Sequence, residues 1–213
     1  MAAWHTPGLR DLIARRLQGT APGGDPLDVW TTRLAPDQAA ALRRHMPENL
    51  AHAAVMVPLV ERPEGLTVLL TQRASHLKNH PGQISFPGGR IEPGDAGPWE
   101  AALRETREEI GLPARHAALA GYLRDHLVLT GYRITPVVAF VRPGFELALD
   151  RTEVEDVFEV PLEFVLDPAN HLPRTRAYAG HEFLTHDIPY RDRHIWGATA
   201  GMLLSLYDLL REA

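Results

Sequence analysis

The chain has 213 residues, a formal net charge of −5 and 45% hydrophobic residues, so it suits one domain with a packed core. It contains no cysteine, which excludes disulfides, thiolate nucleophiles and cysteine-ligated zinc. Its basic residues are dispersed and no apolar run has the length of a membrane span or a signal-peptide core. We therefore expect a cytoplasmic protein without nucleic-acid or membrane partners, and the sequence leaves a homodimer open.

The N-terminal part of the chain predicts a helical extension. Apolar side chains recur at helical spacing within residues 7–17, at Leu9, Leu12, Ile13 and Leu17. Residues 18–28 are rich in glycine and proline and predict a loop, and a second helix is expected at residues 36–45. We therefore expect residues 1–50 to form an N-terminal helical extension that packs on the main body, which residues 51–213 form.

From residue 51 onward the pattern changes to one of strands. Residues 53–60 and 66–71 predict two strands joined by a turn. Further strands are expected within residues 118–129, at 137–141 and at 157–160. The last element, at residues 196–210, predicts a helix with one broad apolar face. Strands on both sides of a central helix, followed by a terminal helix, predict an α/β protein with a mixed sheet covered on its faces.

The central helix is acidic and follows a turn-rich loop. The loop covers residues 88–98, and the residues from Trp99 onward are mostly good helix formers that stop at Gly111. Three glutamates at i, i+3 and i+4 place their carboxylates on one face of this helix: Glu105, Glu108 and Glu109. These like charges repel one another. A hard divalent cation such as Mg²⁺ or Mn²⁺ would remove the conflict, because both prefer oxygen ligands.

The acidic helix also has a simpler interpretation, a solvated face whose charge is partly neutralised by Arg104 and Arg107. The preceding loop favours the metal interpretation, because Gly88 and Gly89 allow the backbone to approach a ligand closely. Asp95 lies between these glycines and the helix. We expect Asp95 to support the loop by pairing with Arg104 rather than to be an indispensable metal ligand.

The order of Gly89, Asp95 and the run from Arg104 to Leu112 resembles the signature of the Nudix hydrolases. Those enzymes cleave diphosphates joined to another moiety, using Mg²⁺ or Mn²⁺ held by the signature helix, and the resemblance implies an α/β/α sandwich. This chain differs in three details. Asp95 stands where the usual signature has glutamate, eight residues rather than seven separate it from Arg104, and Thr106 occupies a commonly aliphatic position.

The segment from Leu69 to Gly89 resembles the accessory signature of the coenzyme A pyrophosphatases within this family. It contains Lys78, Gly82 and Phe86, each separated from the next by three residues. A late Ile-Trp-Gly-Ala-Thr run is also similar to that subgroup. The resemblance implies a hydrolase that cleaves the diphosphate of coenzyme A or its derivatives to 3′,5′-ADP and 4′-phosphopantetheine or the acylated form of the latter.

Two cations and two glycines are the expected substrate-binding residues. Arg73 and Lys78 would pair with the diphosphate or the 3′-phosphate of coenzyme A. Gly88 and Gly89 would let the backbone come close to the substrate. The alternative is that Arg73 and Lys78 are surface charges where a strand becomes a loop, and this alternative weighs more heavily on Lys78.

The resemblance also implies roles in catalysis. Glu105 and Glu109 are the first expected metal ligands, Glu108 is the next, and Arg104 is expected to orient these carboxylates. The general base differs between members of the family, and some take it from a later loop. Glu153 is the candidate in this chain and Glu105 is the second candidate. The alternative for Glu153 is a solvent-exposed loop charge.

Two other functions stay open. The first is hydrolysis of another nucleoside diphosphate derivative, such as ADP-ribose or a dinucleotide polyphosphate. The second is a Nudix-like domain that binds nucleotides without turnover, although such a domain would usually have lost a helix carboxylate and this chain keeps all three. A zinc site at His181 and His186 is not expected, because the metalloprotease motif needs histidines four apart on a helix and these are five apart, in a segment that suits a strand.

Overall fold

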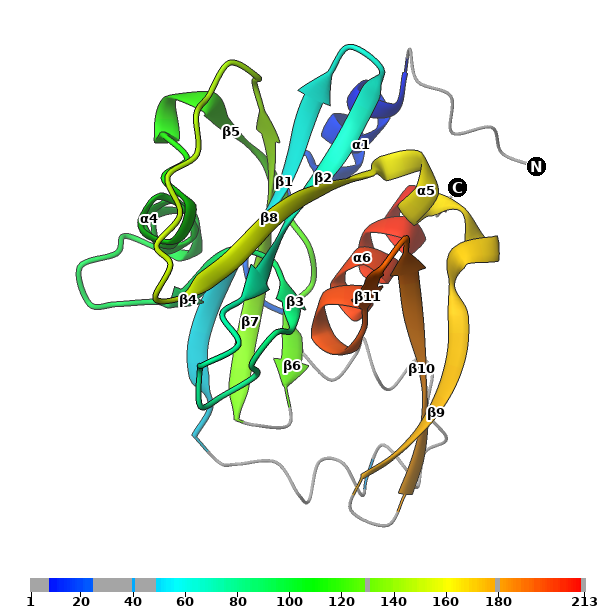
Figure 1. Cartoon of the computed structure of the whole chain (residues 1–213). Helices are drawn as coiled ribbons and strands as arrows, with labels where there is room; N and C mark the ends of the chain where they lie inside the picture. Colours follow the sequence, from blue (N-terminus) through cyan, green and yellow to red (C-terminus); the bar gives the residue numbers. More distant parts are fainter. Residues whose placement is uncertain (1–7, 25–39, 41–48, 129–130, 179–180, 212–213) are drawn as a thin grey trace.

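The computed structural model describes residues 8–24, 40, 49–128, 131–178 and 181–211. A large mixed sheet has helices on both faces, and a smaller antiparallel sheet lies beside it (Figure 1). The large sheet consists of β1 (Ala51–Arg62), β2 (Gly65–Arg73), β3 (Ile84–Ser85), β4 (Gly88–Arg90), β5 (Ala117–Tyr122), β6 (His126–Val128), β7 (Tyr132–Val141) and β8 (Val154–Pro161). The small sheet consists of β9 (Leu172–Tyr178), β10 (His181–Tyr190) and β11 (Arg193–Ile195). The helices are α1 (Leu9–Leu17), α4 (Pro98–Ile110), α5 (Leu162–Leu166) and α6 (Gly197–Arg211), with 3-10 turns at Ala114–His116 and Pro168–Asn170.

Strand β1 is the centre of the large sheet. It pairs in parallel with β7 along its length and antiparallel with β2 and with the short strand β4. The strand order is β3-β2-β1-β7-β5, with β8 joined to β2 and β6 joined to β7. Most of β1 is buried without alternation, which is the pattern of a strand covered on both faces.

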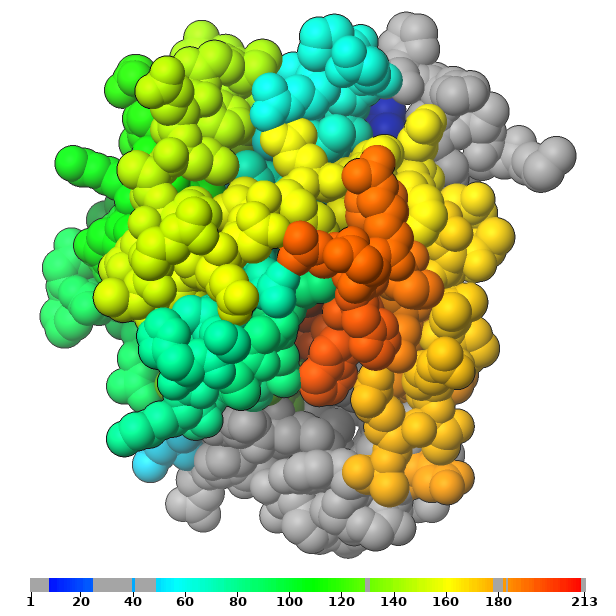
Figure 2. Space-filling model, in the orientation of Figure 1, coloured from blue at the N-terminus to red at the C-terminus, as the bar shows by residue number. Residues whose placement is uncertain are grey.

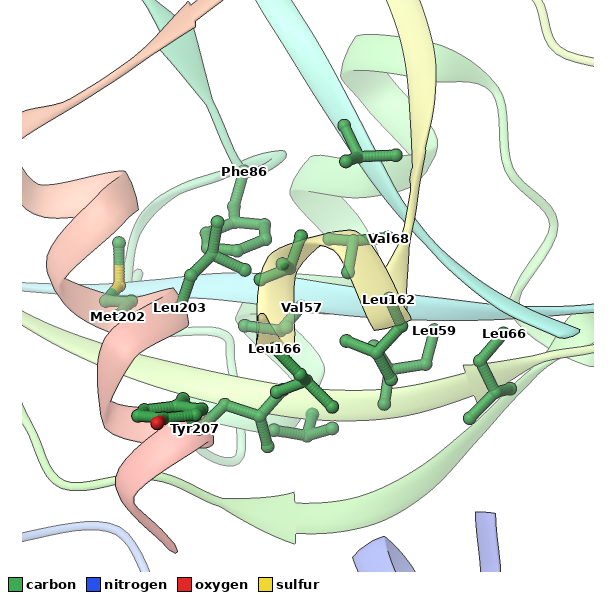
Figure 3. Packing of buried hydrophobic residues seen from close by; sticks show 14 of the residues in the cluster. Val57, Leu59, Leu66, Val68, Phe86, Leu162, Leu166, Met202, Leu203 and Tyr207 are labelled. Carbon is green, nitrogen blue, oxygen red and sulfur yellow. The ribbon is translucent and has the colours of Figure 1, made fainter. Parts of the chain in front are cut away.

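Alternate residues of β1 belong to two separate apolar cores, because successive side chains point to opposite faces of a sheet. Val57 packs in the core under α5 and α6, where Met202, Leu203 and Tyr207 meet the sheet (Figure 3). Met56 packs in the other core, together with the buried side chains of α4. The expected α/β/α sandwich with a mixed sheet is therefore confirmed.

Most of the predicted elements are present. The strands expected between residues 53 and 160, the acidic helix and the C-terminal helix are confirmed, and α1 contacts β5 and α6. The helix expected at residues 36–45 lies almost entirely outside the described residues. No helix in the described part of the chain is long and apolar enough to cross a membrane.

One prediction about the signature loop was wrong. Gly88 and Gly89 are not the start of the loop, because they form β4 and pair with Val55 and Ala54 of β1. Gly88 has a φ of 151°, and a Cβ atom there would lie 2.6 Å from the Cα atom of Val55 and still closer to the Ala54 carbonyl oxygen. The pair of glycines therefore places β4 against the central strand, and the turn-rich loop begins only after it.

We expect Gly88→Ala to destabilise the protein, by about 1–3 kcal/mol from the backbone conformation alone and further from the overlap with β1. Gly94→Ala is the matched control, because Gly94 lies in the following loop and no atom stands within 4 Å of a Cβ there. Urea denaturation would compare the two unfolding midpoints. Equal midpoints would show that β4 does not need a glycine at this position.

Candidate catalytic site

Helix α4 carries the acidic residues, and the following chain holds its C-terminal end. It begins at Pro98 and ends at Gly111, which has a left-handed φ of 72°. The following chain returns to this end of the helix, where the Ala148 N–H donates to the Ile110 carbonyl over 3.0 Å and the Asp150 N–H donates to the Glu109 carbonyl over 2.9 Å. The backbone that presents Glu109 is therefore fixed at the C-terminal end of the helix.

Glu109 is a buried carboxylate, only 5% exposed. Its Oε2 atom accepts a hydrogen bond from the Gly88 N–H over 3.1 Å. Burial raises the pKa of Glu109 to about 8; the Gly88 hydrogen bond and the charge of Arg73 oppose this rise, and the charges of Glu153 and Glu105 add to it. Among the described residues, Arg73 and the Gly88 N–H therefore offset only part of the cost of ionising this carboxylate.

Glu105 lies directly against β4. A Cβ atom at Gly89 would come within 2.6 Å of both carboxylate oxygens of Glu105, so a side chain at this position would displace the carboxylate. Burial raises the pKa of Glu105, and the neighbouring charges of Glu108 and Glu153 raise it further, while Arg104 opposes them. Glu105 and Glu109 are thus two partly or fully buried carboxylates packed on the two glycines of β4.

Arg104 ties the helix to the loop before it. Its Nη1 atom donates to Glu105 over 2.9 Å and to Glu108 over 3.2 Å. Its Nε and Nη2 atoms hold the carboxylate of Asp95 over 3.1 and 3.0 Å, and the hydrogen bond from Arg104 lowers the pKa of Asp95. The expected pair between Asp95 and Arg104 is therefore present. The described hydrogen bonds of Arg104 all join it to acceptor atoms within this chain.

The other two acidic candidates lie in more exposed positions. The side chain of Glu108 is 61% exposed and shares Arg104 with Glu105. Glu153 lies in an exposed turn, and its carbonyl accepts the Ala74 N–H over 2.8 Å. Its charge raises the pKa of both Glu105 and Glu109, so the fold brings this distant turn close to the helix carboxylates.

The donor set fits a hard divalent cation. In the described ranges no three acidic or histidine side chains already stand in a metal-ligand arrangement. Glu105 and Glu109 nevertheless converge on β4 near Glu153, and their raised pKa values mark negative charge that the surrounding residues do not neutralise. Oxygen donors of this kind suit Mg²⁺ or Mn²⁺, and a bound cation would supply the missing positive charge.

A cavity of about 820 Å³ adjoins the glycines of β4. Gly88 and Gly89 line it, and the same two glycines contact the carboxylates of Glu109 and Glu105. No aspartate or glutamate is among the described lining residues. The lining includes cationic and aromatic side chains: Arg73, Arg90, Arg176, Phe86, Tyr132 and Trp196. This composition suits an anionic ligand with a flat ring.

The sequence anticipated only part of this lining. Of the predicted substrate-binding residues, Arg73, Gly88 and Gly89 line the cavity, whereas Lys78 is exposed and is not among the described lining residues. Arg90, Tyr132 and Arg176 were not anticipated. They come from β4, β7 and β9, and no local pattern signals that these strands meet at one cavity.

Comparison with known proteins adds independent evidence. The model of the NUDIX domain matches residues 50–179. The uncharacterized Nudix hydrolase NudL of Enterobacter sp. (strain 638) is 39% identical over 158 residues, which cover 74% of this chain and 82% of that protein. The protein of the same name from Escherichia coli (strain K12 / DH10B) is 39% identical over 162 residues, which cover 75% and 83%. In fold, the chain is similar to the MutT protein from Methanosarcina mazei Go1, with a TM-score of 0.50, 19% identity and coverage of 78% of this chain and 99% of that chain.

We expect burial of Glu109 to make the metal-free protein less stable as the pH rises from about 4.5 to about 8. The unfolded chain loses this proton near its ordinary pKa, while the folded protein keeps it until the raised pKa, so protonation favours folding and the advantage is lost across this window. Glu109→Gln should remove this loss. At pH 8.5 in a chelator, the variant should melt at least about 2 °C above wild type, since 1 kcal/mol corresponds to about 2–4 °C in a domain of this size.

Thermal unfolding between pH 4.5 and 8.5 would measure this difference. Glu100→Gln is the control, because Glu100 is an exposed residue of the same helix. Parallel profiles for wild type and Glu109→Gln would contradict a raised pKa at Glu109.

Proposed function

Since the chain belongs to the Nudix family of hydrolases, we propose that it is a metal-dependent diphosphatase of coenzyme A or its derivatives. The products would be 3′,5′-ADP and 4′-phosphopantetheine, or the acylated form of the latter. The observation that carries this proposal is the position of the Leu69–Gly89 segment. This segment resembles the coenzyme A pyrophosphatase signature, and it supplies a wall of the cavity beside the carboxylates through Arg73, Phe86 and the two glycines.

The chain's own residues divide the work of the proposed reaction. Glu105 and Glu109, with Glu108, would hold Mg²⁺ or Mn²⁺, which when bound neutralises charge on the diphosphate and makes water a better nucleophile. Arg104 orients Glu105 through its hydrogen bond, and the Gly88 N–H holds Glu109 in place. Gly88 and Gly89 line the cavity that would receive the diphosphate.

Water attacks one phosphorus atom, and the bond from that phosphorus to the bridging oxygen breaks. We propose that Glu153 accepts the proton of the attacking water, with Glu105 as the second candidate for this role. Arg73 lies in the cavity wall and would stabilise charge on the leaving phosphate. Lys78 is exposed, so its proposed contact is with a part of the substrate that extends beyond the cavity.

The alternatives concern substrate and turnover. Another nucleoside diphosphate derivative would use the same carboxylates and cavity, so this alternative differs only in the groups attached to the diphosphate. A binding module without turnover is the weaker alternative, because it has no need for buried carboxylates that repel one another.

Turnover of a substrate panel would test the proposal. Purified protein would be assayed with coenzyme A, acetyl-coenzyme A, ADP-ribose and diadenosine tetraphosphate, each with Mg²⁺ and with Mn²⁺. Mass spectrometry would identify the products. We expect coenzyme A or its acyl form to have the highest kcat/KM and to yield 3′,5′-ADP. A much higher kcat/KM for ADP-ribose or the dinucleotide would refute the assignment to coenzyme A, and no metal-dependent turnover of any substrate would favour the binding module.

We expect Glu105→Gln and Glu109→Gln each to lower kcat by about 100-fold or more, the scale of losing one key electrostatic stabiliser. The double variant should lose little more than the worse single variant, because residues that act as one unit are not additive. Turnover and Mn²⁺ titration would be measured for both single variants, the double variant and the exposed control Glu100→Gln. Near-normal turnover and unchanged Mn²⁺ affinity in either single variant would remove the metal role.

Glu153→Gln should instead lower kcat while leaving Mn²⁺ affinity unchanged, and equal losses of both would make Glu153 a ligand rather than the base.

A further inference from the structure

Arg176 of β9 is a cation held rigidly in the cavity wall. Its Nε atom donates to the Thr185 hydroxyl over 3.2 Å, and its Nη2 atom donates to Oδ1 of Asp187 over 2.8 Å. The Cζ atom of its guanidinium lies 4.7 Å from the centre of the Trp196 ring. Three contacts therefore fix the plane of this guanidinium before any ligand arrives, which lowers the entropy lost on binding.

Asp187 is the buried centre of this arrangement. It is only 3% exposed and also accepts a hydrogen bond from His194 over 2.9 Å, with Arg174 3.5 Å away. Burial alone would raise the pKa of Asp187, but the hydrogen bonds from Arg176 and His194 outweigh it and lower the pKa. One carboxylate thus faces two arginines, so the cluster keeps an excess of positive charge.

This cluster lies on a different wall of the cavity from the glycines of β4. Strands β9 and β10 lie on the other side of α6 from α4 and β4 in Figure 1. Arg176 and Trp196 both line the cavity that reaches Gly88 and Gly89. Strand β11 contacts β3, and Figure 2 shows the orange β10–β11 region beside the teal residues that precede β4. One ligand could therefore touch both walls.

We infer that Arg176 binds a phosphate group of the substrate other than the diphosphate that is cleaved. The inference rests on the proposed function, under which this group is the 3′-phosphate of coenzyme A. The side chain of Arg176 is 38% exposed, and its Nη1 atom has no hydrogen-bond partner among the described residues. Nη1 is therefore free to donate to a phosphate, whose oxygens match the fork of a guanidinium.

Asp187 and Thr185 are positioning residues in this arrangement, because they act on the ligand only through Arg176. The ring of Trp196 packs against the guanidinium of Arg176. The absence of acidic side chains among the described lining residues leaves the positive charge of Arg176 uncompensated on the cavity side. A second phosphate would supply that compensation, and a substrate without one would leave Arg176 facing water.

Binding of two nucleotides that differ by one phosphate would test the site. Calorimetry in one Mg²⁺ buffer would give the Kd values of 3′,5′-ADP and 5′-AMP. Wild type should bind 3′,5′-ADP about 10- to 100-fold more tightly, the range for a charge-assisted hydrogen bond. Arg176→Gln should bring the two Kd values close together. The same change should remove any preference in kcat/KM for coenzyme A over dephospho-coenzyme A.

Arg174→Gln is the matched control. Arg174 also faces Asp187 and carries the same charge, but it is 58% exposed and is not among the described residues of the cavity wall. This variant should keep the preference of wild type. Equal effects of Arg174→Gln and Arg176→Gln would mean that general electrostatics, rather than a contact, sets the preference.

The outcomes separate the site from the proposed function. Equal affinities of wild type for the two nucleotides, or a preference that survives Arg176→Gln, would overturn the Arg176 site whatever the substrate. Selective binding of 3′,5′-ADP without hydrolysis of coenzyme A would keep the Arg176 site and refute the proposed function. If Arg176→Gln fails to fold, the comparison of the two nucleotides on wild type still decides whether the extra phosphate is recognised.

Discussion

The contact between the two glycines of β4 and the two carboxylates of α4 is the constraint on which the site depends. The Gly88 N–H holds Glu109, and Glu105 fills the space where Gly89 lacks a side chain. The contact is possible only because β4 pairs with β1, the strand buried on both faces by the two cores. The position of the candidate metal ligands is therefore set by the most rigid part of the sheet rather than by a loop.

This arrangement places an electrostatic conflict in the interior and resolves only part of it. Arg104 contacts Asp95, Glu105 and Glu108, so the outer part of the acidic face is partly neutralised. Glu109 receives only a backbone N–H and the more distant charge of Arg73, and its pKa rises to about 8. Uncompensated charge of this kind is typical of functional sites. There a residue can lower the stability of the fold, and a bound ligand can restore that stability.

The sequence could predict whatever depends on local pattern. Apolar runs predicted the strands, and the i, i+3, i+4 spacing placed the three glutamates on one helix face. The sequence could not distinguish the buried Glu109 from the exposed Glu108, because that difference depends on contacts between distant segments. The glycine pair was assigned to a loop, because nothing in its neighbourhood reveals that β1 lies within reach. Arg176 could not be found for the same reason, since its strand is polar and contains a proline, and its partners Asp187 and Trp196 come from later elements.

The two charged clusters, at α4 and at Arg176, also differ in how they are prepared for a ligand. Burial raises the pKa values of Glu105 and Glu109, so their ionised state is unfavourable without a cation. Arg176 is already satisfied on one side by Asp187, Thr185 and Trp196, so the ligand-free form is stable and preorganised. Under the proposed function, the first arrangement would couple binding of a metal to the stability of the fold, and the second would select a ligand without reorganising the wall. A substrate with two separated phosphate groups would use both, because each region then meets the charge that it lacks.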